Sequence, residues 1–253
     1  NCLDLRVEER EFFFADLPPA FDGWRILLLS DLHLDGVEGL TAAVLERISG
    51  MEFDLCLIGG DIRMEVYGPV APALRQLKRL VRGIKTRQGS FGVLGNHDCI
   101  EMVPDLEDAG LIMLVNDAQV LEKDGAQLWL VGVDDPHYYK VHDPETAFRP
   151  VPTEAFKVFL AHSPEAYKEA AAFGTRLYLC GHTHGGQICA PSRRPIFTHC
   201  RAPRHMAAGH WQHNGMQGYT SRGVGASGIP LRFNCPGEIT LLTLRRHTET
   251  PAS

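Results

Sequence analysis

The chain has 253 residues, of which 44% are apolar and 22% are charged, as expected for a globular protein long enough to bury a sizeable core. Its formal net charge of −6 argues against a protein that binds nucleic acid mainly through phosphate contacts. No segment approaches the run of about 18 apolar residues that predicts a membrane span. We expect a single domain over 1–253, with its core over about 25–245.

Five short apolar runs each end in a polar corner, most of them rich in glycine. Runs of this length bounded by turn residues are typical of buried strands. They lie at 25–30, 53–58, 90–94, 156–160 and 176–180. In the segments between these runs, apolar residues recur at helical spacing. We expect helices at 38–49, 69–84, 101–109 and 164–173. In the last of these, Ser163 is the expected N-cap and Gly174 the expected end.

The C-terminal part of the chain has a different pattern. Segments 126–133, 216–224 and 238–244 look like strands that are not each followed by a helix. Strands that alternate with helices predict a largely parallel sheet. The additional strands lead us to expect an α/β fold in which two mixed sheets pack face to face, with helices on the outside.

Each of the five buried strands is followed by side chains that can bind metal. Because the carboxyl ends of parallel strands meet at one edge of a sheet, we expect these side chains to lie together. They are Asp31, His33, Asp61, Asn96, His97, Asp98, His162, His182 and His184. Imidazole and carboxylate ligands suit zinc, manganese and iron, and the lack of a thiolate argues against a structural zinc site. The seven cysteines include no CxxC pair, so free thiols in a reducing compartment are expected.

The motifs DLH, GGD, GNHD, AHS and GHTH, in that order, resemble those of the calcineurin-like metallophosphoesterases. The resemblance covers about 25–245 and implies a four-layer αββα sandwich. The segments GHTHGGQI and SRGVGASGIPLRFNCPGEI are further similar to a bacterial branch of small phosphodiesterases that are often membrane-tethered. One member type of that branch cleaves the pyrophosphate of a UDP-diacylglucosamine lipid A precursor.

The resemblance also implies a role for each motif residue. One metal would be held by Asp31, His33, Asp61 and His184. A second would be held by Asp61, Asn96, His162 and His182, so that Asp61 bridges the two. His97 would protonate or stabilise the leaving oxygen. Asp98 would orient His97, although it could equally cap the helix expected at 101–109.

General chemistry makes this arrangement reasonable. Two divalent cations about 3.5–4 Å apart can hold the attacking and leaving oxygens of an in-line displacement. A water that bridges them loses its proton near neutral pH, which provides a hydroxide nucleophile. The bridging carboxylate of Asp61 would screen the two cations from each other, and Asn96 would add a neutral oxygen ligand. The pair His182 and His184 lies two residues apart, which in extended backbone places both rings on one face.

Several other residues have two interpretations. Arg193, Arg194, Arg222 and Arg232 are candidates for substrate binding, but the arginines could instead pair with carboxylates or face solvent. The histidines at 199–213 form either a solvated basic face or a rim for an anionic substrate. The loop 134–149 either covers the substrate or packs its aromatic residues at the surface.

The predicted function is a metal-dependent phosphohydrolase, either a phosphodiesterase or a pyrophosphatase, with two divalent ions of Mn, Fe or Zn. Three substrate classes remain: UDP-diacylglucosamine, a phospholipid-like diester and a cyclic nucleotide. The alternative function is a metal-dependent scaffold for partner proteins, which would have no need of the acid His97. A lipid substrate predicts an exposed apolar patch beside the metals, for which 12–14 (FFF) is a candidate unless it is a buried edge strand.

The expected location is cytoplasmic, with peripheral contact at the inner membrane as an alternative. Because the chain opens on Asn1, an N-terminal leader or anchor could have been removed. The sequence does not indicate an oligomeric state.

Overall fold

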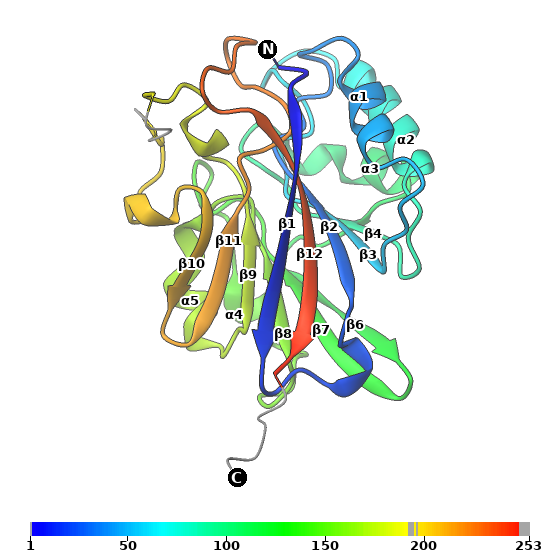
Figure 1. Cartoon of the computed structure of the whole chain (residues 1–253), viewed down its shortest axis with the longest axis vertical. Coiled ribbons are helices and arrows are strands. Elements are labelled where there is room, and N and C mark those ends of the chain that lie inside the picture. Colours follow the sequence, from blue (N-terminus) through cyan, green and yellow to red (C-terminus); the bar gives the residue numbers. More distant parts are fainter. Residues whose placement is uncertain (1, 192–194, 196, 248–253) are drawn as a thin grey trace.

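A computed structural model describes residues 2–191, 195 and 197–247. Two six-stranded sheets pack face to face, and helices cover the outer face of each (Figure 1). This arrangement confirms the predicted αββα sandwich. None of the helices formed by the described residues is long and apolar enough to cross a bilayer.

The first sheet has the strand order β1-β12-β2-β3-β4-β5. Its members are β1 (Leu5–Phe14), β2 (Arg25–Leu29), β3 (Leu55–Ile58), β4 (Ser90–Gly92), β5 (Ile112–Met113) and β12 (Gly237–Arg246). Neighbouring strands are parallel except for β12 and β2, which are antiparallel. The carboxyl ends of β2, β3 and β4 therefore lie at one edge, the upper edge in Figure 1.

The second sheet has the order β10-β11-β9-β8-β7-β6. Its members are β6 (Asp117–Lys123), β7 (Ala126–Gly132), β8 (Lys157–Leu160), β9 (Leu177–Cys180), β10 (Gly209–His213) and β11 (Met216–Thr220). The central strands are parallel, and an antiparallel hairpin closes each side, β6 with β7 and β10 with β11.

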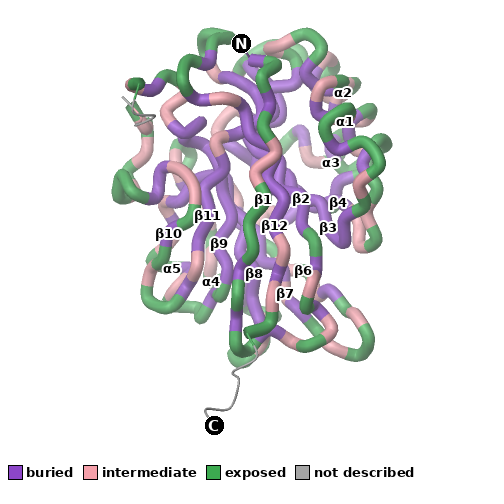
Figure 2. Tube along the Cα trace, viewed as in Figure 1, coloured by how far each residue is buried: buried purple, intermediate pink, exposed green. Residues whose placement is uncertain are grey.

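Apolar side chains fill three layers. The layer between the sheets contains Leu28, Leu57, Leu160, Leu179 and Tyr219. The second layer lies between the first sheet and helices α1 (Leu40–Arg47), α2 (Ala71–Gly83) and α3 (Val103–Asp108), and the third lies under α4 (Pro144–Phe148) and α5 (Tyr167–Ala172). The inner strands are buried on both faces (Figure 2), which explains their continuous apolar runs.

The five predicted buried strands are present, each within two residues of the expected bounds. The helix predicted at 164–173 forms as a 3-10 turn, η3 (Pro164–Ala166), followed by α5. The Ser163 side chain caps the turn by accepting a hydrogen bond from the Glu165 amide. The helix predicted at 101–109 is likewise a 3-10 turn, η2 (Ile100–Met102), followed by α3. All seven cysteines are free thiols.

The FFF segment at 12–14 belongs to the edge strand β1. Phe12 and Phe14 are buried, whereas Phe13 is 51% exposed, as alternation along a half-covered strand requires. Of the two interpretations of this segment, the structure therefore shows the edge strand. The remaining 3-10 turns are η1 (Pro19–Phe21), η4 (His184–Gly186) and η5 (Arg204–Met206).

Candidate metal centre

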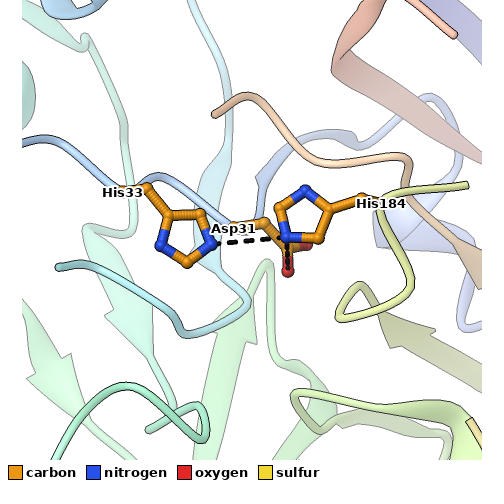
Figure 3. Close-up of side chains that lie close together, drawn as sticks. All are labelled: Asp31, His33 and His184. Carbon is orange, nitrogen blue, oxygen red and sulfur yellow. Dashed lines mark hydrogen bonds and ion pairs between the residues drawn. The ribbon is translucent and has the colours of Figure 1, made fainter. Parts of the chain in front are cut away.

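The predicted metal-binding side chains converge where the carboxyl ends of the parallel strands of the two sheets meet. They come from the loops after β2, β3, β4, β8 and β9. In the first group, His184 Nε2 lies 3.4 Å from Asp31 Oδ1 and 3.3 Å from His33 Nε2. All three side chains are buried, and Figure 3 shows them directed toward one another. One donor atom from each lies within 4.8 Å of the others, so the three can share one ion.

A second group surrounds His162. Its Nε2 atom lies 3.1 Å from Asn96 Oδ1, 3.2 Å from His182 Nδ1 and 3.4 Å from Asp61 Oδ2. Asp61 Oδ2 is also 3.6 Å from His33 Nε2, in the first group. The Asp61 carboxylate therefore lies between the two groups and contacts both.

The backbone at these residues is strained. Five of the seven predicted ligands have positive φ angles between 41° and 73°: Asp31, His33, Asp61, His182 and His184. For residues with a Cβ, such conformations cost about 1 kcal/mol or more each, and they cluster at functional sites. The strain turns the chain sharply after each strand and brings side chains from different loops into one space.

Extended backbone, expected from the sequence for His182 and His184, is not what the structure shows. The chain turns at His182 (φ 73°) and enters the 3-10 turn η4. Gly181 makes this turn possible, because a Cβ at that position would lie 1.9 Å from Ser30 Oγ and 2.3 Å from Asp31 Oδ2. The His182 amide donates to the Asp31 carboxylate, which joins the loops after β9 and β2.

Burial and mutual contacts shift the pKa values of the cluster. Burial lowers the pKa of His33 to about 4 and that of His182 to about 3, so both imidazoles are neutral. Burial raises the pKa of Asp31 to about 6. Burial also lowers the pKa of His162, but the contacts with Asp61, together with Asp31 and the Gly59 carbonyl, outweigh burial and raise that pKa to about 10.

These values fit a site for cations. Metal ligands must be deprotonated, and a cation beside Asp61 and His162 would favour the neutral form of the His162 imidazole. Imidazoles, carboxylates and one amide, buried except for the half-buried Asn96, are ligands that divalent transition metals accept. The residues present therefore fit a divalent metal.

His97 faces the same cavity. Its backbone amide donates to Asp61 Oδ1 at 2.8 Å. Its Nδ1 atom is held by the Met64 carbonyl, which leaves Nε2 3.9 Å from Asp61 Oδ2 and 3.5 Å from Ser227 Oγ. Because a carbonyl can only accept, Nδ1 carries a proton, and Nε2 is the atom available to a substrate.

Asp98 has other partners than the predicted ones. Its buried carboxylate accepts hydrogen bonds from the amides of Ile62 and Gly95, each at 3.0 Å. These bonds fix the loops that carry Asp61 and Asn96. The ring of His97 is held by Met64, and α3 begins only after a separate 3-10 turn.

Of the predicted substrate-binding arginines, two lie behind the cluster. Arg222 Nη2 lies 2.6 Å from Glu8 Oε1, and Arg222 Nε lies 2.7 Å from Glu238 Oε2. Arg232 is buried, donates to the carbonyls of Arg222, Gly223 and Gly225, and lies 3.2 Å from His184 Nδ1. For Arg222 the structure thus shows the pairing with carboxylates. Arg193 and Arg194 lie outside the described residues.

A cavity of about 480 Å³ opens over the cluster, lined by Asp61, Asn96, His97 and His182 among others. Two further histidines line it. The His199 carbonyl accepts a hydrogen bond from His182 Nε2. The ring centroid of His137 lies 4.0 Å from that of His182. His137 Nδ1 is 2.8 Å from Glu165 Oε1. His137 was not singled out from the sequence, although its segment DDPH follows β7, whose carboxyl end lies at the same edge as that of β8.

Comparison with known proteins identifies related sequences over most of the chain. The family model of the calcineurin-like phosphoesterases matches residues 25–186. The chain is 30% identical to the uncharacterised metallophosphoesterase YkuE of Bacillus subtilis over 90% of this chain and 82% of that protein. It is also 30% identical to phosphodiesterase YaeI of Escherichia coli over 94% of this chain and 87% of that protein.

A solved structure shares the fold. TT1561 of Thermus thermophilus has a TM-score of 0.53 with 12% sequence identity, covering 80% of this chain and 90% of that chain. The order of the motifs, their convergence at one edge of the sandwich and the match over most of the chain lead to one conclusion. The protein belongs to the calcineurin-like phosphoesterase family.

Proposed function

We propose that the protein hydrolyses phosphodiesters or pyrophosphates with two bound divalent cations. The observation that carries the proposal is the central position of Asp61. Its Oδ2 atom is 3.6 Å from His33 Nε2 and 3.4 Å from His162 Nε2, so one carboxylate serves two groups of ligands. Asp31, His33 and His184 complete one set, and Asn96, His162 and His182 complete the other.

The residues around the ions have separate roles. Cations of Mn, Fe or Zn held by these ligands would supply Lewis acidity and activate water. In its doubly protonated form, with Nδ1–H bonded to the Met64 carbonyl, His97 contacts the substrate through Nε2–H and gives that proton to the leaving oxygen, which leaves the ring neutral. Asp98 holds the loops of Asp61 and Asn96 in register through backbone hydrogen bonds. A scaffold protein would have no use for an acid at position 97.

The substrate is assigned by class. The name of the relative YaeI supports a phosphodiesterase over a monoesterase. A lipid-linked nucleotide pyrophosphate such as UDP-diacylglucosamine, a phospholipid-like diester and a cyclic nucleotide are the candidates. The first two would place the enzyme in peripheral contact with the cytoplasmic face of a membrane. Arg193 and Arg194 remain candidates for contacts with the substrate.

The test is hydrolysis of bis-p-nitrophenyl phosphate with Mn²⁺ by the variants Asp61→Ala and His97→Ala. We expect Asp61→Ala to lose both bound metal and activity. His97→Ala should keep its metal and lose about 10²–10⁴-fold in kcat, as expected when a general acid is removed. Asp108→Ala, at an exposed position on α3, is the matched control. Turnover in both site variants equal to that of the control would refute the proposal.

A further inference from the structure

Exposed apolar side chains gather at the mouth of the cavity. They are Ile188, Phe197, Ile229, Leu231 and Phe233, with exposed fractions of 38%, 69%, 67%, 46% and 57%. We call these five residues the apolar rim. Single exposed apolar residues are common on protein surfaces, whereas several in one place mark a binding surface.

Backbone contacts hold the rim together. Ile188 and Phe233 form a β-bridge, and the Phe233 amide donates to the Gln187 carbonyl at 3.0 Å. The Gln187 side chain donates to the Ile229 carbonyl at 3.0 Å. Segments 187–189 and 227–233 therefore form one surface. Ile188 and Phe197 also line the cavity itself, so the rim is continuous with the metal centre.

The charge of this part of the chain differs from that of the whole. Residues 170–237 include seven arginines and no aspartate, glutamate or lysine, although the whole chain has a net charge of −6. Among the described residues, Arg201 and Arg204 are exposed, and Arg204 Nη2 donates to the Pro195 carbonyl at 2.9 Å, two residues from Phe197. Arg6 lies beside Phe233 in a surface depression that Asp4 also lines. Arg6 and Arg204 thus lie beside the apolar rim, whereas Arg222 and Arg232 are held behind the metal-binding cluster.

We propose that the apolar rim docks the protein on a lipid bilayer with anionic headgroups. The five side chains enter the boundary between headgroups and acyl chains, while the surrounding arginines contact lipid phosphates. The charge favours a bilayer as the occupant, because a bilayer with anionic headgroups can accept the apolar side chains and pair with the arginines at the same time. The mouth of the cavity then opens directly onto the membrane surface. Docking on the bilayer does not require the proposed function; only the cleavage of a substrate at the membrane surface rests on it.

The test is co-sedimentation of the protein with vesicles of phosphatidylcholine alone and of phosphatidylcholine mixed with phosphatidylglycerol. The rim variant carries Ile229→Ser, Leu231→Ser and Phe233→Ser, none of which lines the cavity. The matched control carries Phe13→Ser and Ile112→Ser, at positions 51% and 45% exposed on β1 and β5. Hydrolysis of bis-p-nitrophenyl phosphate, a soluble substrate, is measured in parallel.

We expect the wild type and the control to bind the anionic vesicles, and the rim variant to bind at least about tenfold more weakly because three inserted side chains are removed. Hydrolysis of the soluble diester should stay unchanged in the rim variant. Equal binding by the rim variant and the control would overturn the proposal, as would equal binding to both kinds of vesicle. Rim-dependent self-association without vesicle binding would also overturn it and would assign the rim to protein contacts. If neither the wild type nor any variant hydrolysed the diester, the proposed function would be refuted. The docking proposal would still be tested, because vesicle binding is measured without turnover.

Discussion

The two imidazoles of the GHTH motif are held on a turn, not on a strand. The positive φ angles of His182 and His184 direct the rings to different neighbours. His184 lies against Asp31 and His33, while His182 lies against His162. One short segment can therefore contribute a ligand to each of two ions.

This division predicts the metal content of four variants. His184→Ala should lose mainly the ion beside Asp31 and His33, and His182→Ala mainly the ion beside Asn96 and His162, because each removes a ligand from one group. The double variant His184→Ala/His33→Ala should then keep as much metal as His184→Ala alone. The double variant His184→Ala/His162→Ala should lose nearly all of it. Elemental analysis after dialysis measures each value.

His210→Ala is the control for these variants, since that ring packs on Phe12 at a centroid distance of 5.5 Å. A different division would be evident in the same data. If either single variant lost all its metal, or if His33→Ala lowered the metal content of His184→Ala further, the two groups would not be separate sites.

Single residues differ in how far the sequence predicts their role. The convergence of the candidate ligands could be predicted because carboxylates and imidazoles follow the buried strands, and parallel strands share one edge. The hydrogen bond between the His97 ring and the Met64 carbonyl could not be predicted. Every residue has a carbonyl, and only the folded loop places this one beside the ring. Asp98 illustrates the same limit, since its partners are backbone amides.

At the scale of elements, Glu165 joins three segments of the second sheet's loops. It lies within η3, contacts His137 in the loop after β7, and accepts a hydrogen bond from the Arg201 amide at 2.8 Å. Burial alone would raise the pKa of Glu165, but the hydrogen bonds from His137 and the Arg201 amide lower it to about 2. The ionised carboxylate therefore stabilises the folded state.

A glutamate with a lowered pKa contributes stability above its unfolded pKa, and that contribution is lost as the pH falls toward the folded pKa. We expect Glu165→Gln to reduce the free energy of unfolding by about 1–2 kcal/mol at pH 7, a value reduced from the full shift because the site is only partly buried. The difference should be constant down to about pH 5 and narrow below about pH 4.5. Urea unfolding of the two proteins at pH 7, 5 and 4 measures it.

Glu169→Gln on α5 is the control for Glu165→Gln, because Glu169 is an exposed residue on a neighbouring turn. A difference that grew as the pH fell would show that the carboxylate does not carry the effect.

The sequence predicted the inner strands and helices better than the edges of the sheets. Inner strands such as β3 are buried on both faces, so their apolar runs stand out. Edge strands such as β6 and β10 alternate between exposed and partly buried residues, and their patterns resemble those of loops. The loop 134–149 even contains the short helix α4, whose five residues are too few to show a helical period.

At the scale of the whole molecule, the metal centre joins the two sheets. Asp31, His33 and Asp61 follow strands of the first sheet, and His162, His182 and His184 follow strands of the second. Several of these ligands also hold strained backbone angles. Cations bound at this site would therefore contribute to the packing of one half of the sandwich against the other, as well as to chemistry.

Removal of metal should accordingly lower the melting temperature. A ligand that binds only the folded state at a hundredfold its Kd contributes about 2.7 kcal/mol, which for a chain of this size corresponds to about 5–10 °C. We expect a shift of this order between protein dialysed against EDTA and the same protein with Mn²⁺ restored, and the shift should grow with the concentration of Mn²⁺. Asp61→Ala, which lacks the carboxylate common to both groups, should melt at one temperature with and without the ion. Differential scanning calorimetry measures these melting temperatures. If the melting temperature of the wild type were the same with EDTA and with Mn²⁺, the converging side chains would not hold a cation.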